Sequence, residues 1–264
     1  MGKCKLRQFI FVFGVIFSFA CSQAPIHKQD SKQGKPLTIA VASNFYLTAK
    51  LLLATHPYYQ NVKLVSGSSG TLYAQAKNGA PFDVYLAANS YFPQQLYKDG
   101  LSNKPVDYAQ GKLVLYPVAT GKSLEEILKQ SNRIAIANPD IAPYGMAAKQ
   151  ILERNLVDNT KLVFANNVSQ AFQFVDTGNV DTAFLAQSLL YHAHQQSKRA
   201  QYSQYLLLPL DTYNPIMQQA TIMLNSNKQA LAQDFLEYLV SKEVQEGIAN
   251  MGYLAVNQKL DDNK

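Results

Sequence analysis

Four short segments combine small hydroxyl residues, asparagine and glycine directly before a predicted helix; we call them the junctions. They are residues 42–44 (ASN), 66–71 (SGSSGT), 138–145 (NPDIAPYG) and 165–169 (ANNVS). Each follows a predicted strand, so each places a helix N-terminus at the carboxyl end of a strand, where free backbone N–H groups and the helix dipole favour an anion. Because none contains Lys or Arg, neutral hydrogen-bond donors would hold that anion. Helix capping is the alternative for any single junction, since Ser, Thr and Asn are common caps.

The sequence lacks the motifs of the common enzyme classes. It contains no P-loop, no G-x-G-x-x-G after a strand and no G-x-S-x-G elbow, because residues 67–70 (GSSG) have the wrong spacing. Both cysteines, Cys4 and Cys21, precede the folded region, which excludes thiol catalysis there. His192 and His194 are two positions apart on a predicted helix and point to different faces, so they form a poor metal site. A hydrolase that uses a junction serine stays an alternative, although no histidine or acid pairs with these serines in the motifs.

The elements that must position the junctions alternate between strands and helices. Such alternation predicts βαβ units and mainly parallel sheets. Alone, the pattern allows one large domain or two lobes that are joined by crossing segments near 115–120 and 208–214. The predicted strands are 37–42, 62–65, 82–88, 112–118, 133–137, 161–165, 182–185, 205–210 and 220–224. The predicted helices are 45–59, a helix after Gly70, 91–98, 124–129, 145–155, 169–175, 189–197 and a long amphipathic region over 229–251.

The first residues predict a secretory signal peptide over residues 1–20. Three basic residues precede an apolar run, 9–17, that is too short to span a membrane. Cleavage before Cys21 would leave that residue as the only cysteine of the mature chain, so we expect it to carry a lipid anchor; a free surface thiol is the alternative. The polar residues 21–36 predict a flexible tether. We therefore expect a protein of the periplasm or the extracytoplasmic face, anchored by lipid at Cys21.

The net charge of +6 does not indicate a nucleic-acid partner. Loss of Lys3, Lys5 and Arg7 with the signal peptide lowers the charge from +6 to +3. Two of the remaining charges lie in the tether, so the folded region is close to neutral. A hydrophobic content of 47% excludes a disordered chain.

Around the junctions the sequence resembles the molybdate-binding proteins of ABC importers, a group of periplasmic binding proteins. This resemblance implies an α/β, two-lobe periplasmic-binding-protein fold, in which each lobe is a mainly parallel sheet flanked by helices and the ligand cleft lies between the lobes. It places lobe 1 at 37–117 and 212–258, and lobe 2 at 118–211. The matching stretches, in the family's order, are AVASNF (40–45), SGSSGTLYAQAKNGAPFDVYLAAN (66–89), IANPDIAPYGMAAKQIL (136–152), NNVSQAFQFVDTGNVDTAFLAQS (166–188) and YNPIMQQATIML (213–224).

The resemblance also implies which residues hold the oxyanion. They are Ser43 and Asn44 from the first junction, Ser69 from the second, and Tyr144 and Val168, through backbone N–H groups, from the other lobe. Where some members add a tyrosine hydroxyl, this chain has Ala186. Molybdate and tungstate are fully deprotonated at neutral pH and offer only acceptors, so a site built of donors suits them. The lack of Asp and Glu at 43–44, 69 and 168 argues against phosphate, whereas sulfate has the same charge and shape and stays an alternative.

We therefore expect an exported binding protein that captures molybdate or tungstate and delivers it to an ABC permease. It would catalyse no reaction, need no cofactor besides this ligand, bind no nucleic acid, act as a monomer and contact the membrane only through a lipid anchor. The alternatives are a receptor for sulfate or another tetrahedral anion, and the extracytoplasmic serine hydrolase.

Overall fold

The computed structural model describes residues 35–56 and 61–256, which belong to one compact unit. The predicted signal peptide, Cys21 and nearly all of the predicted tether lie outside the described residues, as do positions 57–59 of the first predicted helix. Within the part of the chain that the structure describes, no helix is both long and apolar enough to cross a membrane.

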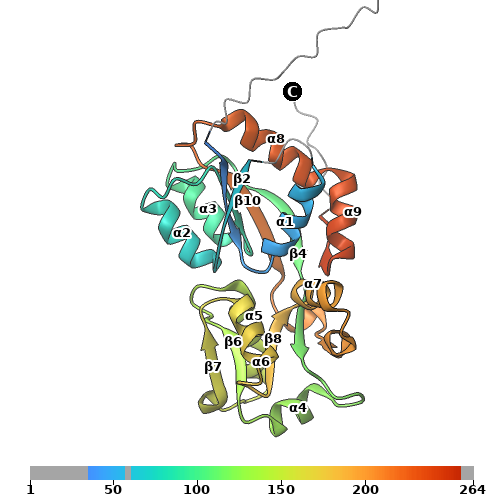
Figure 1. The fold of residues 1–264 in the computed structure, drawn as a ribbon. Coiled ribbons are helices and arrows are strands. Elements are labelled where there is room, and N and C mark those ends of the chain that lie inside the picture. The colour runs from blue at the N-terminus through green and yellow to red at the C-terminus, as the bar shows by residue number, and fades with distance from the viewer. Residues whose placement is uncertain (1–34, 57–60, 257–264) are drawn as a thin grey trace, which may run out of the picture. The chain divides into compact units, whose positions relative to one another are not determined.

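Six strands form the first sheet, in the order β11-β4-β10-β3-β1-β2. Strand β1 runs parallel to β2 and β3, whereas β10 is antiparallel to β3 and β4, and β11 is antiparallel to β4. Together with helices α1, α2, α3, α8 and α9 we call this sheet lobe 1 (Figure 1). Its strands are β1 (Leu37–Ala42), β2 (Val62–Gly67), β3 (Val84–Ala87), β4 (Val106–Gly111), β10 (Ile216–Ile222) and β11 (Tyr253–Leu254). Its helices are α1 (Tyr46–Thr55), α2 (Ser69–Lys77), α3 (Tyr91–Lys98), α8 (Gln229–Val240) and α9 (Lys242–Asn250).

Five strands form the second sheet, in the order β7-β6-β8-β5-β9. Strand β6 is parallel to β7 and β8, and β5 is antiparallel to β8 and β9. With helices α4 to α7, this sheet forms lobe 2. Its strands are β5 (Leu113–Tyr116), β6 (Ile134–Ala137), β7 (Leu162–Ala165), β8 (Thr182–Ala186) and β9 (Leu206–Leu207). Its helices are α4 (Leu124–Gln130), α5 (Pro143–Arg154), α6 (Val168–Asp176) and α7 (Gln187–Ser197), with short 3-10 turns at Asn159–Lys161, Ala200–Ser203 and Leu210–Thr212.

The predicted alternation of strands and helices is confirmed, but both sheets are mixed rather than mainly parallel. Strands joined through a helix, such as β1 and β2 or β6 and β7, are parallel. The strands on either side of the crossings between lobes, β4, β5, β9 and β10, pair antiparallel instead. Strand β4 is absent from the predicted strands, because its residues VDYAQG include Asp and Gly, two types that are depleted in strands.

The predicted boundaries between lobe 1 and lobe 2 stay a prediction, and the strand pairing favours a shift of the first boundary. Residues Leu113–Tyr116 fall inside the range 37–117 expected for lobe 1, yet they pair with β8 and β9 of lobe 2. Strand pairing therefore favours a first crossing at Lys112. The return lies between β9 and β10, where the range 208–214 was expected.

The core of lobe 1 covers both faces of its sheet. Along β1, Ile39 and Val41 pack into the cluster under α1, α8 and α9, whereas Ala40 between them packs into the cluster under α2 and α3. This alternation is the period of two of a strand that is buried on both faces. Figure 1 shows the two groups of helices on opposite sides of the sheet. The carboxyl ends of β1, β2 and β3 are thereby fixed at one edge.

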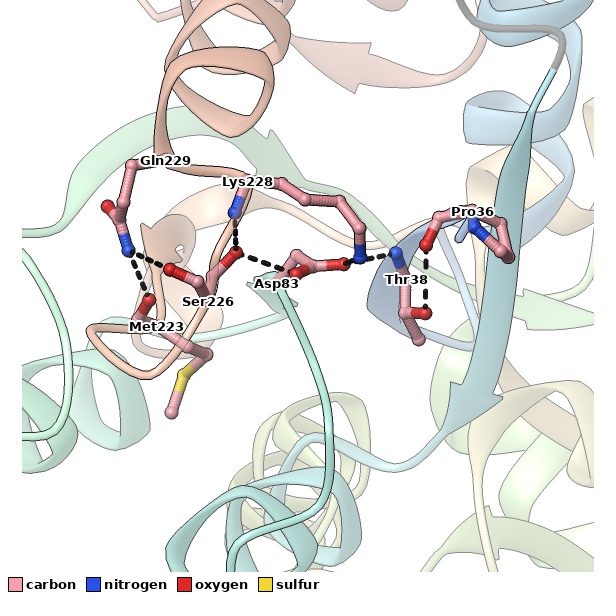
Figure 2. Close-up of polar contacts among 7 residues, drawn as sticks. All are labelled: Pro36, Thr38, Asp83, Met223, Ser226, Lys228 and Gln229. Atoms are coloured by element: carbon pink, nitrogen blue, oxygen red, sulfur yellow. Dashed lines mark hydrogen bonds and ion pairs between the residues drawn. The ribbon is translucent and has the colours of Figure 1, made fainter. Parts of the chain in front are cut away.

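An ion pair between the buried Asp83 and the partly buried Lys228 lies at the opposite, amino ends of β1 and β3. The Lys228 ammonium is 2.8 Å from one carboxylate oxygen of Asp83, which also accepts the Thr38 N–H at 2.7 Å. The Ser226 hydroxyl donates to the other oxygen at 2.6 Å. Figure 2 shows how these contacts join the loop before β3, strand β1 and the turn that leads into α8. The cluster therefore anchors α8 to the sheet, away from the junctions.

Candidate functional site

All five expected ligand residues line one small pocket at the carboxyl ends of the strands. Ser43, Asn44 and Ser69 come from lobe 1, and Tyr144 and Val168 come from lobe 2. Each is at least nine-tenths buried. The pocket is small, with a volume of about 10 Å³. The remaining lining residues are Ala42, Gly67, Ser68, Ala88, Ala142, Pro143 and Asn167.

Two of the three serines of the second junction, Ser68 and Ser69, have different roles. Ser68 caps α2, because its hydroxyl oxygen accepts the Thr71 N–H at 3.2 Å. The Ser69 hydroxyl oxygen instead accepts the Ala88 N–H at 2.9 Å. Since this bond occupies the oxygen as an acceptor, the Ser69 O–H is left to donate to an anion. The capping alternative thus holds for Ser68, and Ser69 has the geometry of a ligand.

The first junction is held by its backbone. The Ser43 N–H donates to the Gly67 carbonyl at 2.9 Å, and its own carbonyl accepts the Ser169 hydroxyl at 3.1 Å. The Asn44 carbonyl accepts two hydroxyls, from Tyr253 at 2.8 Å and from Ser188 at 3.3 Å. These bonds fix the path of the chain and leave the Ser43 hydroxyl lining the pocket.

Lobe 2 offers donors from the first turns of two helices. Tyr144 is the second residue of α5 and Val168 the first of α6, positions whose N–H groups have no acceptor within the helix. The Asn167 side chain caps α6 by accepting the Gln170 N–H at 3.0 Å. Helix α5 begins against the end of β6 because residue 145 is glycine; a Cβ there would lie 1.9 Å from the Ala137 carbonyl oxygen.

A buried amide that sequence reasoning missed connects these residues. Gln218 is fully buried at an irregularity of β10. Its Oε1 accepts the Asn44 amide at 3.1 Å and the Tyr108 hydroxyl at 2.9 Å, and its Nε2 donates to the Tyr144 hydroxyl at 3.3 Å. The Asn44 amide therefore points toward Gln218. The one sequence signal that could have indicated Gln218 is a polar residue at an inward position of strand β10, within the matching stretch 213–224.

The electrostatics of the site come from dipoles. None of the described residues that line the pocket carries a formal charge, and Asp140 of the third junction is exposed and outside it. Burial raises the pKa of the Tyr144 and Tyr108 hydroxyls well above the ordinary value, so both stay neutral. Such a pocket suits a fully deprotonated anion, because it presents donors and no carboxylate.

The two histidines of helix α7, which the sequence analysis considered as metal ligands, lie in different surroundings. Among the described residues, no group of three or more His, Cys, Asp or Glu side chains could hold a metal ion. His192 is buried and its Nε2 lies 2.8 Å from the Thr48 hydroxyl, whereas His194 contacts the Arg199 carbonyl at 3.1 Å. As expected, the two imidazoles have different surroundings.

Two helix-flanked sheets whose junctions meet at one uncharged pocket define a two-lobe α/β binding protein. Comparison with known proteins agrees: the family model described as bacterial extracellular solute-binding protein matches residues 37–254. The chain belongs to this family. It is therefore a binding protein and not an enzyme, which leaves the hydrolase alternative without support.

Two relatives show which branch of the family is similar. The molybdate-binding protein ModA of Azotobacter vinelandii is 34% identical over 232 residues, which cover 84% of this chain and 90% of the relative. ModA of Rhodobacter capsulatus is also 34% identical, over 81% of this chain and 86% of the relative. The solved structure of the periplasmic molybdate-binding protein from Azotobacter vinelandii matches with a TM-score of 0.74 at 31% identity, and covers 83% of this chain and 99% of that chain.

Proposed function

We propose that this chain captures molybdate or tungstate outside the cytoplasm and delivers it to an ABC permease. One observation carries the proposal: Ser43, Asn44, Ser69, Tyr144 and Val168 converge from two lobes on one uncharged pocket that is lined by hydrogen-bond donors. The similarity to proteins named for molybdate binding supports the choice of anion. In this proposal the anion is held by the Ser43 and Ser69 hydroxyls and by backbone N–H groups, including those of Tyr144 and Val168.

A thermal-shift panel tests the choice of anion. The purified chain is heated with molybdate, tungstate, sulfate or phosphate, each at the same excess. A ligand at about 1,000 times its Kd stabilises the folded state by about 4 kcal/mol, so the Tm rises by several degrees. Molybdate and tungstate should raise the Tm, and phosphate should not. A rise with sulfate alone would favour the sulfate receptor.

We also propose that the mature chain is anchored by lipid at Cys21. The support is the signal-like segment before Cys21, together with the lack of any other cysteine after it. Radiolabelled palmitate fed to cells that produce the protein should label it, and Cys21→Ser should abolish the label. A label that persists in the variant, or a wild-type protein without label, would contradict the anchor.

A further inference from the structure

Gly70 forms a backbone contact between the two lobes. Its N–H donates to the Ile141 carbonyl at 2.8 Å, which links the first turn of α2 in lobe 1 to the third junction in lobe 2. A Cβ added at Gly70 would lie 2.9 Å from the Ile141 Cα and 3.0 Å from its Cβ. Real Cβ atoms essentially never approach a heavy atom more closely than 3.0 Å, so only glycine allows the lobes to come this close.

In each lobe, the residue that makes this contact lies close in sequence to a residue that lines the pocket. Gly70 directly follows Ser69, and Ile141 precedes Tyr144 by three residues. Ser69 and Tyr144 are the proposed donors that face the anion from lobe 1 and from lobe 2. The separation between these donors is therefore set close to the point where the Gly70 and Ile141 backbones touch.

Other hydrogen bonds between the lobes depend on side chains that rotate. Ser169 donates to the Ser43 carbonyl at 3.1 Å, and Ser188 donates to the Asn44 carbonyl at 3.3 Å. Both use hydroxyls, which adapt to small changes in spacing by rotation about χ1. A backbone pair has no such freedom, and its repulsion rises steeply once the atoms touch.

We infer that Gly70 and Ile141 form one stop, besides the close approach of Gly252 to the Ser188 backbone, that limits how closely the two lobes approach around the bound anion. Gly70 is then a positioning residue: it touches no ligand, and it controls whether donors of both lobes reach the anion at once. This inference rests on the proposed function.

Gly70→Ala tests the stop. The added methyl group should hold the lobes apart by a few tenths of an ångström, so at least one hydrogen bond to the anion is lost. Titration calorimetry should show molybdate affinity lowered by about tenfold or more. The loss should appear mainly as faster dissociation, followed by stopped-flow tyrosine fluorescence.

Gly247→Ala is the matched control. Gly247 is also helical, in α9, and a Cβ there would meet only the Met251 Cε, at 3.9 Å. This variant should bind molybdate as the wild type does. Ile141→Ala keeps the backbone of the stop and should also retain affinity.

The methyl group added in Gly70→Ala would also lie 3.0 Å from the Phe92 Cζ, which belongs to the same lobe. The experiment must therefore distinguish the effect of the contact between the lobes from the effect of this contact within lobe 1. The double variant Gly70→Ala/Phe92→Leu relieves that contact and also serves if the single variant folds poorly. It should bind as weakly as the single variant is expected to. If the double variant recovers affinity, or if Gly70→Ala binds molybdate as the wild type does, the inference about the stop is wrong, and the proposed function is unaffected. A wild-type chain that binds no molybdate overturns the proposed function and this inference with it.

Discussion

The Gln218 amide in lobe 1 donates a hydrogen bond of 3.3 Å to the Tyr144 hydroxyl in lobe 2. The same side chain accepts the Asn44 amide at 3.1 Å and the Tyr108 hydroxyl at 2.9 Å. One buried side chain thus connects the first junction of lobe 1 to the first turn of α5. Gln218 lines no wall of the pocket, yet it touches two of the residues that do.

Gln218→Met should lower both stability and molybdate affinity. Methionine has a similar volume, but it removes the acceptor of the buried Asn44 amide, which costs about 1–3 kcal/mol of unfolding free energy, whereas the Tyr108 hydroxyl keeps the Ala87 carbonyl at 3.2 Å as an acceptor. Urea denaturation measures this loss, and calorimetry measures the affinity. Gln173→Met, on the exposed side of α6, is the control and should change neither. Unchanged unfolding free energy in Gln218→Met would show that this network is not stabilising.

Ser69→Ala and Ser43→Ala should each weaken molybdate binding by about tenfold, because each leaves part of a desolvated dianion unpaired. Ser68→Ala provides the contrast within one junction. It removes the cap of α2 and should cost about 1 kcal/mol of stability, with a smaller loss of affinity than Ser69→Ala. Calorimetry and urea denaturation of all three variants separate the two roles. Equal affinity in Ser69→Ala and the wild type would refute Ser69 as a ligand.

Asp83→Asn should destabilise the chain at neutral pH and less so in acid. Burial acts to raise the pKa of Asp83, but hydrogen bonds from Lys228, Ser226 and Thr38 outweigh it and lower the pKa below the ordinary value. The carboxylate therefore stabilises the folded state above pH ~4, and this contribution is lost as the pH falls through the lowered pKa.

The unfolding free energy of Asp83→Asn should be lower than that of the wild type by about 1–3 kcal/mol at pH 7. The difference should shrink by pH 3. Asp99→Asn is the matched control, since its ion pair with Lys77 is exposed and should contribute little. A difference that is the same at both pH values would mean that the charge of Asp83 is not involved.

His192 should make the chain less stable as the pH falls from neutral. Burial lowers its pKa from 6.5 to about 4. Between these values the unfolded state binds a proton that the folded state does not, so stability decreases with falling pH and this effect levels off below about 4. His192→Gln should remove this part of the pH dependence in urea denaturation, whereas His194→Gln should leave it in place. Identical pH profiles for the wild type and His192→Gln would contradict the assignment.

Local patterns predicted most of the elements but not their pairing. The bounds of β1 and of α3 follow from nearby residues, and the structure reproduces both. The direction of β5 and β10 depends on where the chain crosses between lobes, which no local pattern encodes. For the same reason the predicted range of lobe 1 includes residues 113–116. The strand that pairs with these residues, β8, lies about 70 residues further along the chain.

The site was predictable as far as it rests on junctions. Serine and asparagine before a helix indicate free N–H groups, but the choice of Ser43, Ser69 and Val168 came from the family resemblance, since these residues follow strands of two different sheets. The different roles of Ser68 and Ser69 could not be assigned from the sequence, because they depend on the Ala88 N–H, which donates to the Ser69 hydroxyl oxygen. Gln218 could not be found in this way, because its partners come from three separate segments of the chain.

Titration calorimetry of the purified chain with molybdate tests the central claim most directly. The account predicts saturable binding of one molybdate per chain, similar binding of tungstate, and loss of binding in the double variant Ser43→Ala/Ser69→Ala. Absence of binding for both molybdate and tungstate, or tighter binding of sulfate than of either, would contradict it.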